Sequence, residues 1–465
     1  MISHPRLWRL LQDGLLLAAG LVIIVQGARL FAAIQAGAAT TSDFCLDYQT
    51  AQHWLHAIRI YTPVTCWSRY SSTPVPVEYY AHPPFSLLLI APFALFSFSA
   101  ASWLWGILSL ACLALSFLLV CSELSLRGIR IILPLLALFL LWDPTLQSTR
   151  AENIGGGISC LLVVLVWRAL RRGQQGRAGL LAGVVILLKP VPLLLLPFFL
   201  LRRQQRAAIS ALLSLGGSIL LSLVLVGPGA WIDYLGPARA DEGFVVAVPS
   251  NLSLESYVVR WSAGYHEFLH PGAGRAFIDL PPLISGLSLE AALLAGYLLA
   301  GVVLLIFSFR LWKRAPEQVW GEGDDASFAA VLLLTLLVFP SAWDWSLPLL
   351  AMPLLWLALK VTQRSATSKA RWLYGIALIL LAVPFSWSVP AFQLQAQTGL
   401  SWPVQVIAAM LTAIHTIALM LLLIALWPWL KRGPAQAPII EQAPEVISSI
   451  LPQNAFTRTS KLAKS

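Results

Sequence analysis

Charged residues are scarce in this sequence. Only 11% of its 465 residues are Asp, Glu, Lys or Arg, whereas 58% are hydrophobic. Soluble globular domains carry about 25% charged residues, so the composition excludes an ordinary soluble enzyme and a disordered protein. The net charge of +10 does not indicate nucleic-acid binding. The basic residues stand in short clusters between apolar runs, as they do in the cytoplasmic loops of membrane proteins.

Cysteines and familiar catalytic motifs are also few. The five cysteines form no Cys-x-x-Cys pair and therefore no metal-binding spacing. Cys45 and Cys66 fall in one polar loop, where a disulfide and two free thiols are both compatible with the sequence. Cys112, Cys121 and Cys160 lie in or beside apolar runs and are interpreted as small core residues. The patterns GxxxxGK[ST], GxGxxG and HExxH are absent, which argues against ATP-driven pumps and zinc metalloproteases.

Long apolar runs dominate what is present. A membrane-spanning helix needs about 20 apolar residues, and the runs predict an all-α polytopic membrane protein with about 11 to 13 membrane segments. The clear runs cover residues 14–35, 83–98, 101–121, 207–228, 286–309, 327–340, 347–359, 372–390 and 403–427, and the weaker ones cover 130–142, 155–168 and 179–201.

Two of the weaker regions need special treatment. Four apolar runs lie between the first polar loop and the basic cluster near Arg168, although opposite sides of a membrane require an odd number of crossings. We therefore expect 130–142 or 155–168 to be short or re-entrant. Run 179–201 is expected to be two short helices with Lys189 near the turn, because Pro190 and Pro192 break helices.

The distribution of charge predicts the orientation. Lys and Arg accumulate in cytoplasmic loops, whereas residues 36–82 and 229–285 are long, polar and relatively acidic, so we expect both to be outer loops. Residues 1–432 then form one integral membrane domain, and residues 433–465 form a cytoplasmic, disordered tail. The basic clusters that we assign to the cytoplasm are Arg6 and Arg9; Arg168, Arg171, Arg172 and Arg177; Arg202, Arg203 and Arg206; Arg310, Lys313 and Arg314; Lys360, Arg364, Lys369 and Arg371; and Lys431 and Arg432.

The first outer loop contains the leading catalytic candidates. Residues 42–58 carry apolar side chains at helical spacing, which predicts an amphipathic helix at the membrane surface. Asp43 and Asp47 lie one turn apart on another face of that helix. An outward-facing aspartate there is suited to act as a general base for a sugar hydroxyl. The alternative is that Asp43 only complements the helix N-terminus and that Asp47 is solvated.

Further candidates precede or interrupt apolar runs. Tyr80 and His82 stand just before residues 83–98, either as interfacial anchors or as a rim that faces substrate. Lys189 lies in an apolar stretch, where a charge costs a few kcal/mol and is a functional hypothesis by default. It either neutralises a lipid phosphate or pairs with a carboxylate such as Glu152 or Asp143.

The second outer loop and a later helix end supply the remaining candidates. Asn251 is suited to hydrogen-bond sugar hydroxyls, and Arg260 to grip a phosphate with two parallel hydrogen bonds. In Pro340-Ser341-Ala342-Trp343-Asp344, the carboxyl group of Asp344 either caps a helix or faces the site.

The order of these motifs resembles glycosyltransferase family 87. The motifs are D-F-x-x-x-Y in the first loop, Y-x-H-P-P-F before the second helix, A-G…L-L-K-P-x-P, N-x-S-L…R and P-S-x-W-D. Together they cover most of residues 35–360. The resemblance implies the GT-C fold class, an active site that opens to the outer side, and inverting transfer of mannose from a polyprenyl-phosphate donor. It implies a lipid or glycan acceptor, no cofactor, no nucleic acid and a location in a bacterial inner membrane.

The resemblance also implies roles for individual residues. Asp43 matches the family's catalytic aspartate, with Asp47 as the alternative base, and the donor phosphate would be held by Lys189 and Arg260. Trp345 stands where the family commonly has histidine. The other residues that match the family's motifs, as substrate-binding groups, are Tyr48, His82, Asn251, Trp343 and Asp344.

Two other classes of function remain open from the sequence. A transporter or lipid flippase would explain the number of apolar segments and the broken run around Lys189. It does not readily explain the two long outer loops with an acidic amphipathic helix, and it predicts internal symmetry that the sequence lacks. An inactive scaffold subunit of an envelope-assembly complex is the third possibility.

Overall fold

The structure is a computed structural model that describes most of the chain. Side chains are not described for residues 5–11, 33–39, 43, 64–67, 74–78, 265–267, 278–280 and 431, which lie within helices or strands. The expected tail, 433–465, lies outside the described residues. The residues that the structure describes are 5–39, 43–62, 64–67, 74–78, 82–145, 148, 156–235, 251–263, 265–267, 278–280, 282–283, 286–313, 320–340, 342–363, 366–384, 387, 391, 394 and 401–431.

The described chain is helical, with two small antiparallel hairpins, β1–β2 and β3–β4, in the segments expected to be outer loops. The helical class expected from the sequence is confirmed, with these hairpins as an addition. The elements are α1 (Pro5–Ala39), α2 (Asp43–Leu55), β1 (Val64–Trp67), β2 (Pro74–Glu78), α3 (Ser86–Ile90), η1 (Phe93–Leu95), α4 (Phe98–Glu123), α5 (Ile129–Leu141), α7 (Gly157–Arg171), α8 (Gln175–Leu188), η2 (Val191–Leu194), α9 (Leu195–Leu201), α10 (Gln205–Leu225), α11 (Pro228–Leu235), α14 (Leu254–Ser262), β3 (Tyr265–Glu267), β4 (Ile278–Leu280), α15 (Leu289–Lys313), α16 (Glu322–Val338), η3 (Asp344–Leu350), α17 (Ala351–Thr362), α18 (Ser368–Leu381), α20 (Trp402–Thr412) and α21 (Ile414–Lys431).

Several helices have the length and composition to cross a membrane. Among the described residues there are five, in α1, α4, α10, α15 and the continuous unit of η3 with α17. Helices α20 and α21 meet at a 65° bend and make a sixth if they form one span. The protein is therefore a polytopic membrane protein. The larger number of segments expected from the sequence includes shorter apolar helices such as α5, of 13 residues, and α7, of 15 residues.

Prolines decide where two of the apolar runs break. Run 179–201 forms two short helical pieces, as predicted: α8 ends at Leu188, Lys189 has an extended backbone, and η2 and α9 follow after Pro190. The expectation of one continuous segment over 83–98 is wrong. That run folds as α3 and η1 with a turn between them, where Pro92 has no backbone N–H to continue the first helix.

Helix α16 lies at the centre of the main core. Fifteen of its residues, from Gly323 to Leu337, are buried, as expected for a helix that is apolar on all sides. Helices α8 and α10 pack closely through small residues. A Cβ atom at Gly179 would lie 2.2 Å from the carbonyl oxygen of Ala207, so only glycine permits this approach of the two backbones.

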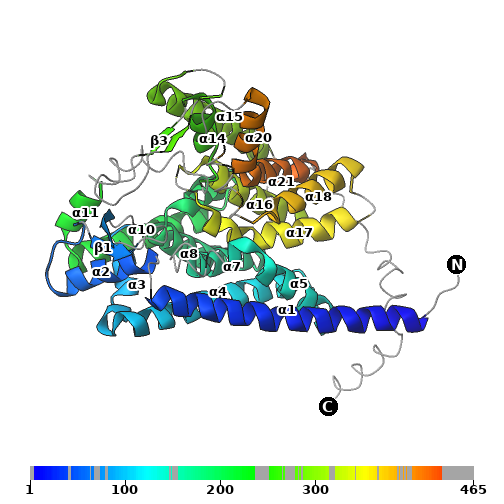
Figure 1. The fold of residues 1–465 in the computed structure, drawn as a ribbon, viewed down its shortest axis with the longest axis horizontal. Helices are drawn as coiled ribbons and strands as arrows, with labels where there is room; N and C mark the ends of the chain where they lie inside the picture. Colours follow the sequence, from blue (N-terminus) through cyan, green and yellow to red (C-terminus); the bar gives the residue numbers. More distant parts are fainter. Residues whose placement is uncertain are drawn as a thin grey trace, which may run out of the picture.

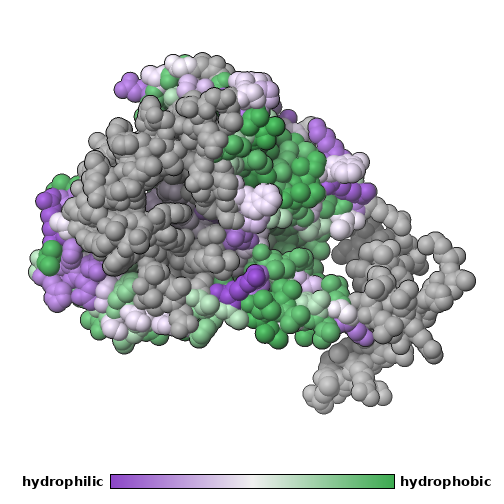
Figure 2. Space-filling view, viewed as in Figure 1, coloured by the Kyte–Doolittle hydropathy of each residue, from purple (hydrophilic) through white to green (hydrophobic). Residues whose placement is uncertain are grey.

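The molecule has two polar ends. Figure 1 draws α2, β1 and α11 together at the left and the N-terminal end of α1 at the right. Figure 2 shows hydrophilic side chains at the left, the top and the upper right of this face, and hydrophobic ones over much of its right half. We call the end with α2, β1 and α11 the loop end, and the end with the N-terminus of α1 the basic end.

Carboxylates and arginines pair at the basic end. Glu123 lies 2.8 Å from both Arg168 and Arg172, and the buried Asp324 pairs with the buried Arg202. The indole nitrogen of Trp167 donates to Asp325 at 2.8 Å. The clustering of arginines was expected from the sequence, whereas these buried acidic partners were not.

Candidate active site

Helix α2 buries one of the two candidate aspartates. Asp47 is 1% exposed, and on the neighbouring face Phe44 and Ala51 are fully buried. The interpretation of Asp47 as a solvated residue is therefore wrong, because α2 packs into the protein against α3, η1 and α4. Asp43 begins the helix one turn earlier, and its side chain lies outside the described residues.

Tyr48 contributes to the packing of α2. Its hydroxyl donates to the carbonyl of Phe96 at 2.9 Å, and its ring meets that of Phe98 edge to face at 5.3 Å between centroids. The hydroxyl also accepts from Gln52 at 3.2 Å. These contacts fix α2 against the start of α4 and thereby fix the position of Asp47, one residue earlier.

His82 lies against Asp47. The Nε2 atom of His82 is 3.7 Å from Oδ1 of Asp47, and the carbonyl of His82 accepts from the hydroxyl of Tyr61 at 2.7 Å. Burial, reinforced by the positive charge of Lys189, lowers the pKa of His82 to about 3. The imidazole is therefore neutral at physiological pH, and Asp47 faces a neutral ring. Tyr80, two residues earlier, lies outside the described residues.

Lys189 joins this group from the end of α8. Its side chain is brought there because α8 ends at Leu188 and Lys189 caps it in an extended conformation. The residue is 7% exposed, and its ammonium lies 6.0 Å from the centroid of the Trp345 ring. Glu152, one of the carboxylates considered as a partner from the sequence, lies outside the described residues.

A pair of tryptophans and Asn251 complete the group. Trp343 and Trp345 stack with 4.8 Å between centroids and 9° between planes. Asn251 pairs with Trp343 through a backbone bridge, and its side-chain amide donates to the carbonyl of Pro340 at 2.6 Å. The second outer loop is thereby fastened to the chain that follows α16.

Two further sequence candidates, Asp344 and Arg260, are buried. Asp344, 2% exposed, is the first residue of η3 and accepts from the backbone N–H of Trp345 at 2.9 Å. The residue before this helix is Trp343, and no side chain caps the helix start, so the choice between a capping and a site-facing Asp344 stays open. Arg260, 1% exposed on α14, donates to the carbonyl of Thr412 at 3.4 Å and so links α14 to α20. Burial lowers the pKa of Arg260 to about 10, which leaves the guanidinium charged at neutral pH.

The structure thus connects five of the sequence candidates, Asn251 included, and one residue that the sequence analysis did not choose. We define the site cluster as Asp47, His82, Lys189, Trp345 and Trp343, to which Asn251 is joined through Trp343. Tyr48 and Arg260 make their described contacts elsewhere. Trp345 was named in the sequence only as a departure from a pattern. Its signal was the Trp-Asp-Trp spacing, which places two indoles two residues apart at a helix start.

This arrangement defines a class of protein: a polytopic membrane protein with a buried carboxylate, a neutral imidazole and an ammonium beside an aromatic pair at one end. The family model of glycosyltransferase family 87 matches residues 80–340, more than half of the chain. The chain therefore belongs to glycosyltransferase family 87 and is a membrane glycosyltransferase. No curated protein matches the chain, and no solved structure does.

The matched region divides the site cluster. It contains His82 and Lys189, as well as Asn251 and Arg260, and it ends before the two tryptophans. The aspartates of α2 precede it. The family match covers these residues without assigning a role to any of them, so the roles of the site residues stay predictions.

Proposed function

We propose that this glycosyltransferase moves mannose from a polyprenyl-phosphate-linked donor to an extracytoplasmic lipid or glycan acceptor, with inversion at the anomeric carbon. The observation that carries the proposal is the position of Lys189, which is 7% exposed at the end of α8 beside a neutral histidine and a tryptophan ring. An ammonium in such surroundings is suited to hold a lipid-linked phosphate, because the attraction between charges increases where water is excluded.

In this proposal the donor phosphate sits at Lys189. The bond between the anomeric carbon and the phosphate oxygen breaks, and the polyprenyl phosphate leaves with the electron pair. Lys189 stabilises the negative charge on that leaving group. The stacked Trp343 and Trp345 offer an apolar wall for the sugar beside it.

The acceptor hydroxyl attacks from the opposite side and loses its proton to a carboxylate of α2. We assign this general base to Asp43, which begins α2. Asp47 is 1% exposed and lies 3.7 Å from His82, so we assign it the role of orienting the imidazole. Asp47 remains the alternative base, because residues one helical turn apart share a face of α2.

The active site is proposed to face the outside of a bacterial inner membrane. Arginines concentrate at the basic end, which the positive-inside tendency assigns to the cytoplasm. Cys45 in α2 is disulfide-bonded, whereas Cys112, Cys121 and Cys160 are free thiols in the helical core. Disulfides persist in oxidising compartments, so the bond at Cys45 supports an extracytoplasmic position for the loop end.

The test is sugar transfer from polyprenyl-phosphate-mannose by the purified chain in lipid vesicles. We expect Asp43→Asn to lose about 100-fold or more in rate, the range for removing a general base. We expect Asp47→Asn to lose less. Transfer near the wild-type rate in Asp43→Asn would exclude Asp43 as the base, and a larger loss in Asp47→Asn would assign the role to Asp47. Movement of the lipid across the vesicle without transfer would instead support a flippase.

A further inference from the structure

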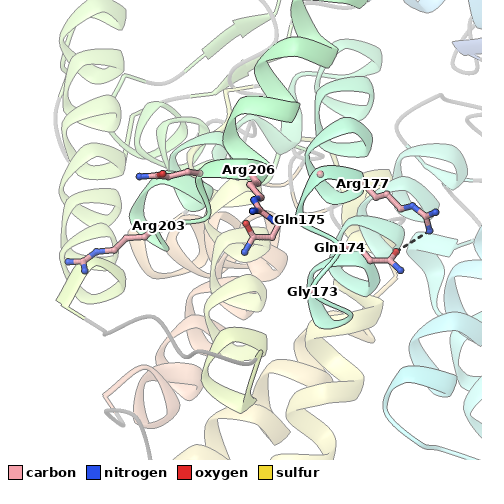
Figure 3. Close-up of a pocket in the computed structure, with 8 residues that line it drawn as sticks. Gly173, Gln174, Gln175, Arg177, Arg203 and Arg206 are labelled. Atoms are coloured by element: carbon pink, nitrogen blue, oxygen red, sulfur yellow. Dashed lines mark hydrogen bonds between the residues drawn. The ribbon is translucent and has the colours of Figure 1, made fainter.

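The basic end contains an open pocket of about 700 Å³ that is far from the site cluster. Two turns build it, one between α7 and α8 and one between α9 and α10. Figure 3 shows Arg206 beside Gln175, with Arg203 and Arg177 on either side and their side chains extending away from Arg206. The residues that line it are Gly173, Gln174, Gln175, Gly176, Arg177, Arg203, Gln205 and Arg206.

The two turns have the same local design. The sequences Arg172-Gly173-Gln174-Gln175 and Arg202-Arg203-Gln204-Gln205 occupy corresponding positions, each from the residue after one helix to the first residue of the next. Gly173 and Arg203 both have a left-handed backbone, with φ of +69° and +54°. The close packing of α8 on α10 then sets the two turns side by side. The pocket is therefore part of the helical framework and not a feature of a single loop.

The arginines of these turns divide into two groups. Arg168, Arg171, Arg172 and Arg202 are paired with Glu123, Asp324 or Asp325. Those that line the pocket, Arg177, Arg203 and Arg206, are exposed, and among the described residues no carboxylate lies within 4.0 Å of them.

Neutral groups and helix ends strengthen the preference of the pocket for an anion. Arg177 contacts only a neutral partner in its described hydrogen bonds, the side-chain oxygen of Gln174 at 3.3 Å. Helices α8 and α10 both begin here without a side-chain cap, so their first N–H groups add positive potential. The pocket therefore combines three arginines that pair with no carboxylate in the described part of the chain, two helix N-termini and glutamine amides.

The apolar surroundings indicate which anion the pocket takes. Leu180, Leu200 and Ile209 lie one helical turn or less from the arginines and are 50%, 64% and 58% exposed. Helix α10 continues from the pocket as a candidate membrane span. A ligand that lies here meets positive charge at the pocket and apolar side chains immediately beyond it. A phospholipid has this distribution, with a phosphate head and acyl chains, whereas a free phosphate would leave the apolar surface uncovered.

We propose that the pocket binds the phosphate headgroup of an anionic phospholipid at Arg206, while Arg177 and Arg203 on either side add positive potential. The 14 residues of α8 separate this pocket from Lys189, a distance of roughly 20 Å along the helix axis. The bound lipid is therefore distinct from the donor, and the proposal does not depend on the assignment of the active site.

The test measures lipid binding by the full chain in detergent. The unfolding midpoint of the purified protein is followed while phosphatidylglycerol, phosphatidylcholine or inorganic phosphate is added. The site variant carries Arg177→Gln, Arg203→Gln and Arg206→Gln. The control variant carries Arg127→Gln, Lys313→Gln and Lys369→Gln, which removes three charges from other exposed basic residues.

We expect phosphatidylglycerol to raise the midpoint of the wild type and the control more than phosphatidylcholine does. The site variant should need about 10-fold or more additional phosphatidylglycerol for the same effect, because each arginine near an anionic lipid contributes severalfold to affinity. Equal responses of the site and control variants would overturn the proposal in favour of general charge attraction. Protection by inorganic phosphate equal to that by phosphatidylglycerol would overturn the assignment to a lipid. Equal unfolding midpoints of the variants in phosphatidylcholine would show that all three proteins are folded.

Discussion

Replacing Lys189 by methionine tests the central feature of the proposed active site. Methionine keeps the length and the apolar stem of the side chain and removes the ammonium. The variant should fold, because Lys189 follows the end of α8 and a neutral side chain is better tolerated than a charge at 7% exposure. Any loss of activity then reports the missing charge.

The size of the expected loss follows from the role of the ammonium. A hydrogen bond to a charged group contributes about 1.5–3 kcal/mol, and a contribution made to the transition state converts to about a 10- to 150-fold change in rate. We expect the loss to appear in kcat, since the charge on the leaving phosphate grows as the bond to the sugar breaks. Lys189→Arg keeps the charge and should recover part of the activity.

The chain offers a matched control in Lys360, at the opposite end of the bundle. Its side chain is 12% exposed, and its ammonium lies 5.7 Å from the centroid of the Trp356 ring, close to the geometry of Lys189 on Trp345. Lys360→Met should change kcat less than about threefold, because Lys360 pairs with Glu322 far from the site cluster. Equal effects of the two substitutions, or a Lys189→Met enzyme with unchanged kcat, would refute the role of Lys189 in transfer.

Three further predictions concern stability and are measured as unfolding midpoints in detergent. The pKa of His82 falls from 6.5 to about 3 on folding, so below about pH 6.5 the unfolded chain binds a proton that the folded protein does not. The free energy of unfolding is therefore unaffected by this group above about pH 6.5 and declines below it, by at most about 1.4 kcal/mol per pH unit. His82→Asn should therefore lose less stability than the wild type between pH 6.5 and pH 5, and parallel losses would contradict this pKa. Gly179→Ala should cost about 1–3 kcal/mol, because its Cβ would lie 2.2 Å from a carbonyl oxygen. Gly217→Ala, with no atom within 4 Å, should be neutral or stabilising, and equal effects would refute the close approach of α8 and α10. Asp324→Ala leaves a buried arginine without its partner and should cost about 3–5 kcal/mol. Glu322→Ala, at a carboxylate that is 59% exposed, should cost less than about 1 kcal/mol, and a larger effect there would reverse the ranking.

The sequence predicted features of the fold that depend on local chemistry. The break between α8 and α9 follows from Pro190 and Pro192, which cannot donate the hydrogen bonds of a continuous helix. The helix over 43–55 follows from the spacing of its apolar side chains. The position of Asp43 at its start follows from the preference of helix N-termini for acidic residues. Such features were visible because each depends on residues within one or two turns of each other.

Features that depend on distant segments were not visible in the sequence. Asp47 was expected to be solvated in one interpretation, yet the packing of α2 against α3 and α4 buries it beside His82. Trp345 acquired its place through stacking on Trp343 and through Lys189, which is more than 150 residues away in the chain. Helical periodicity identifies which face of an element is apolar, but it does not identify the element that covers this face.

The position of Lys189 at the end of α8 also explains how a scarce charge is retained in an apolar protein. The partial negative charge at a helix C-terminus stabilises a cation by about 0.3–1 kcal/mol, and a cation–π contact adds about 0.5–2 kcal/mol where water is excluded. Placing a lysine at membrane depth costs about 2.5–3.5 kcal/mol on insertion scales. The end of α8 and the ring of Trp345 therefore offset much of this cost without a full negative charge of their own. The same helix presents its positive N-terminus to the arginine pocket, so both ends of α8 favour an anion, one through its dipole and the other through the side chain that the dipole stabilises.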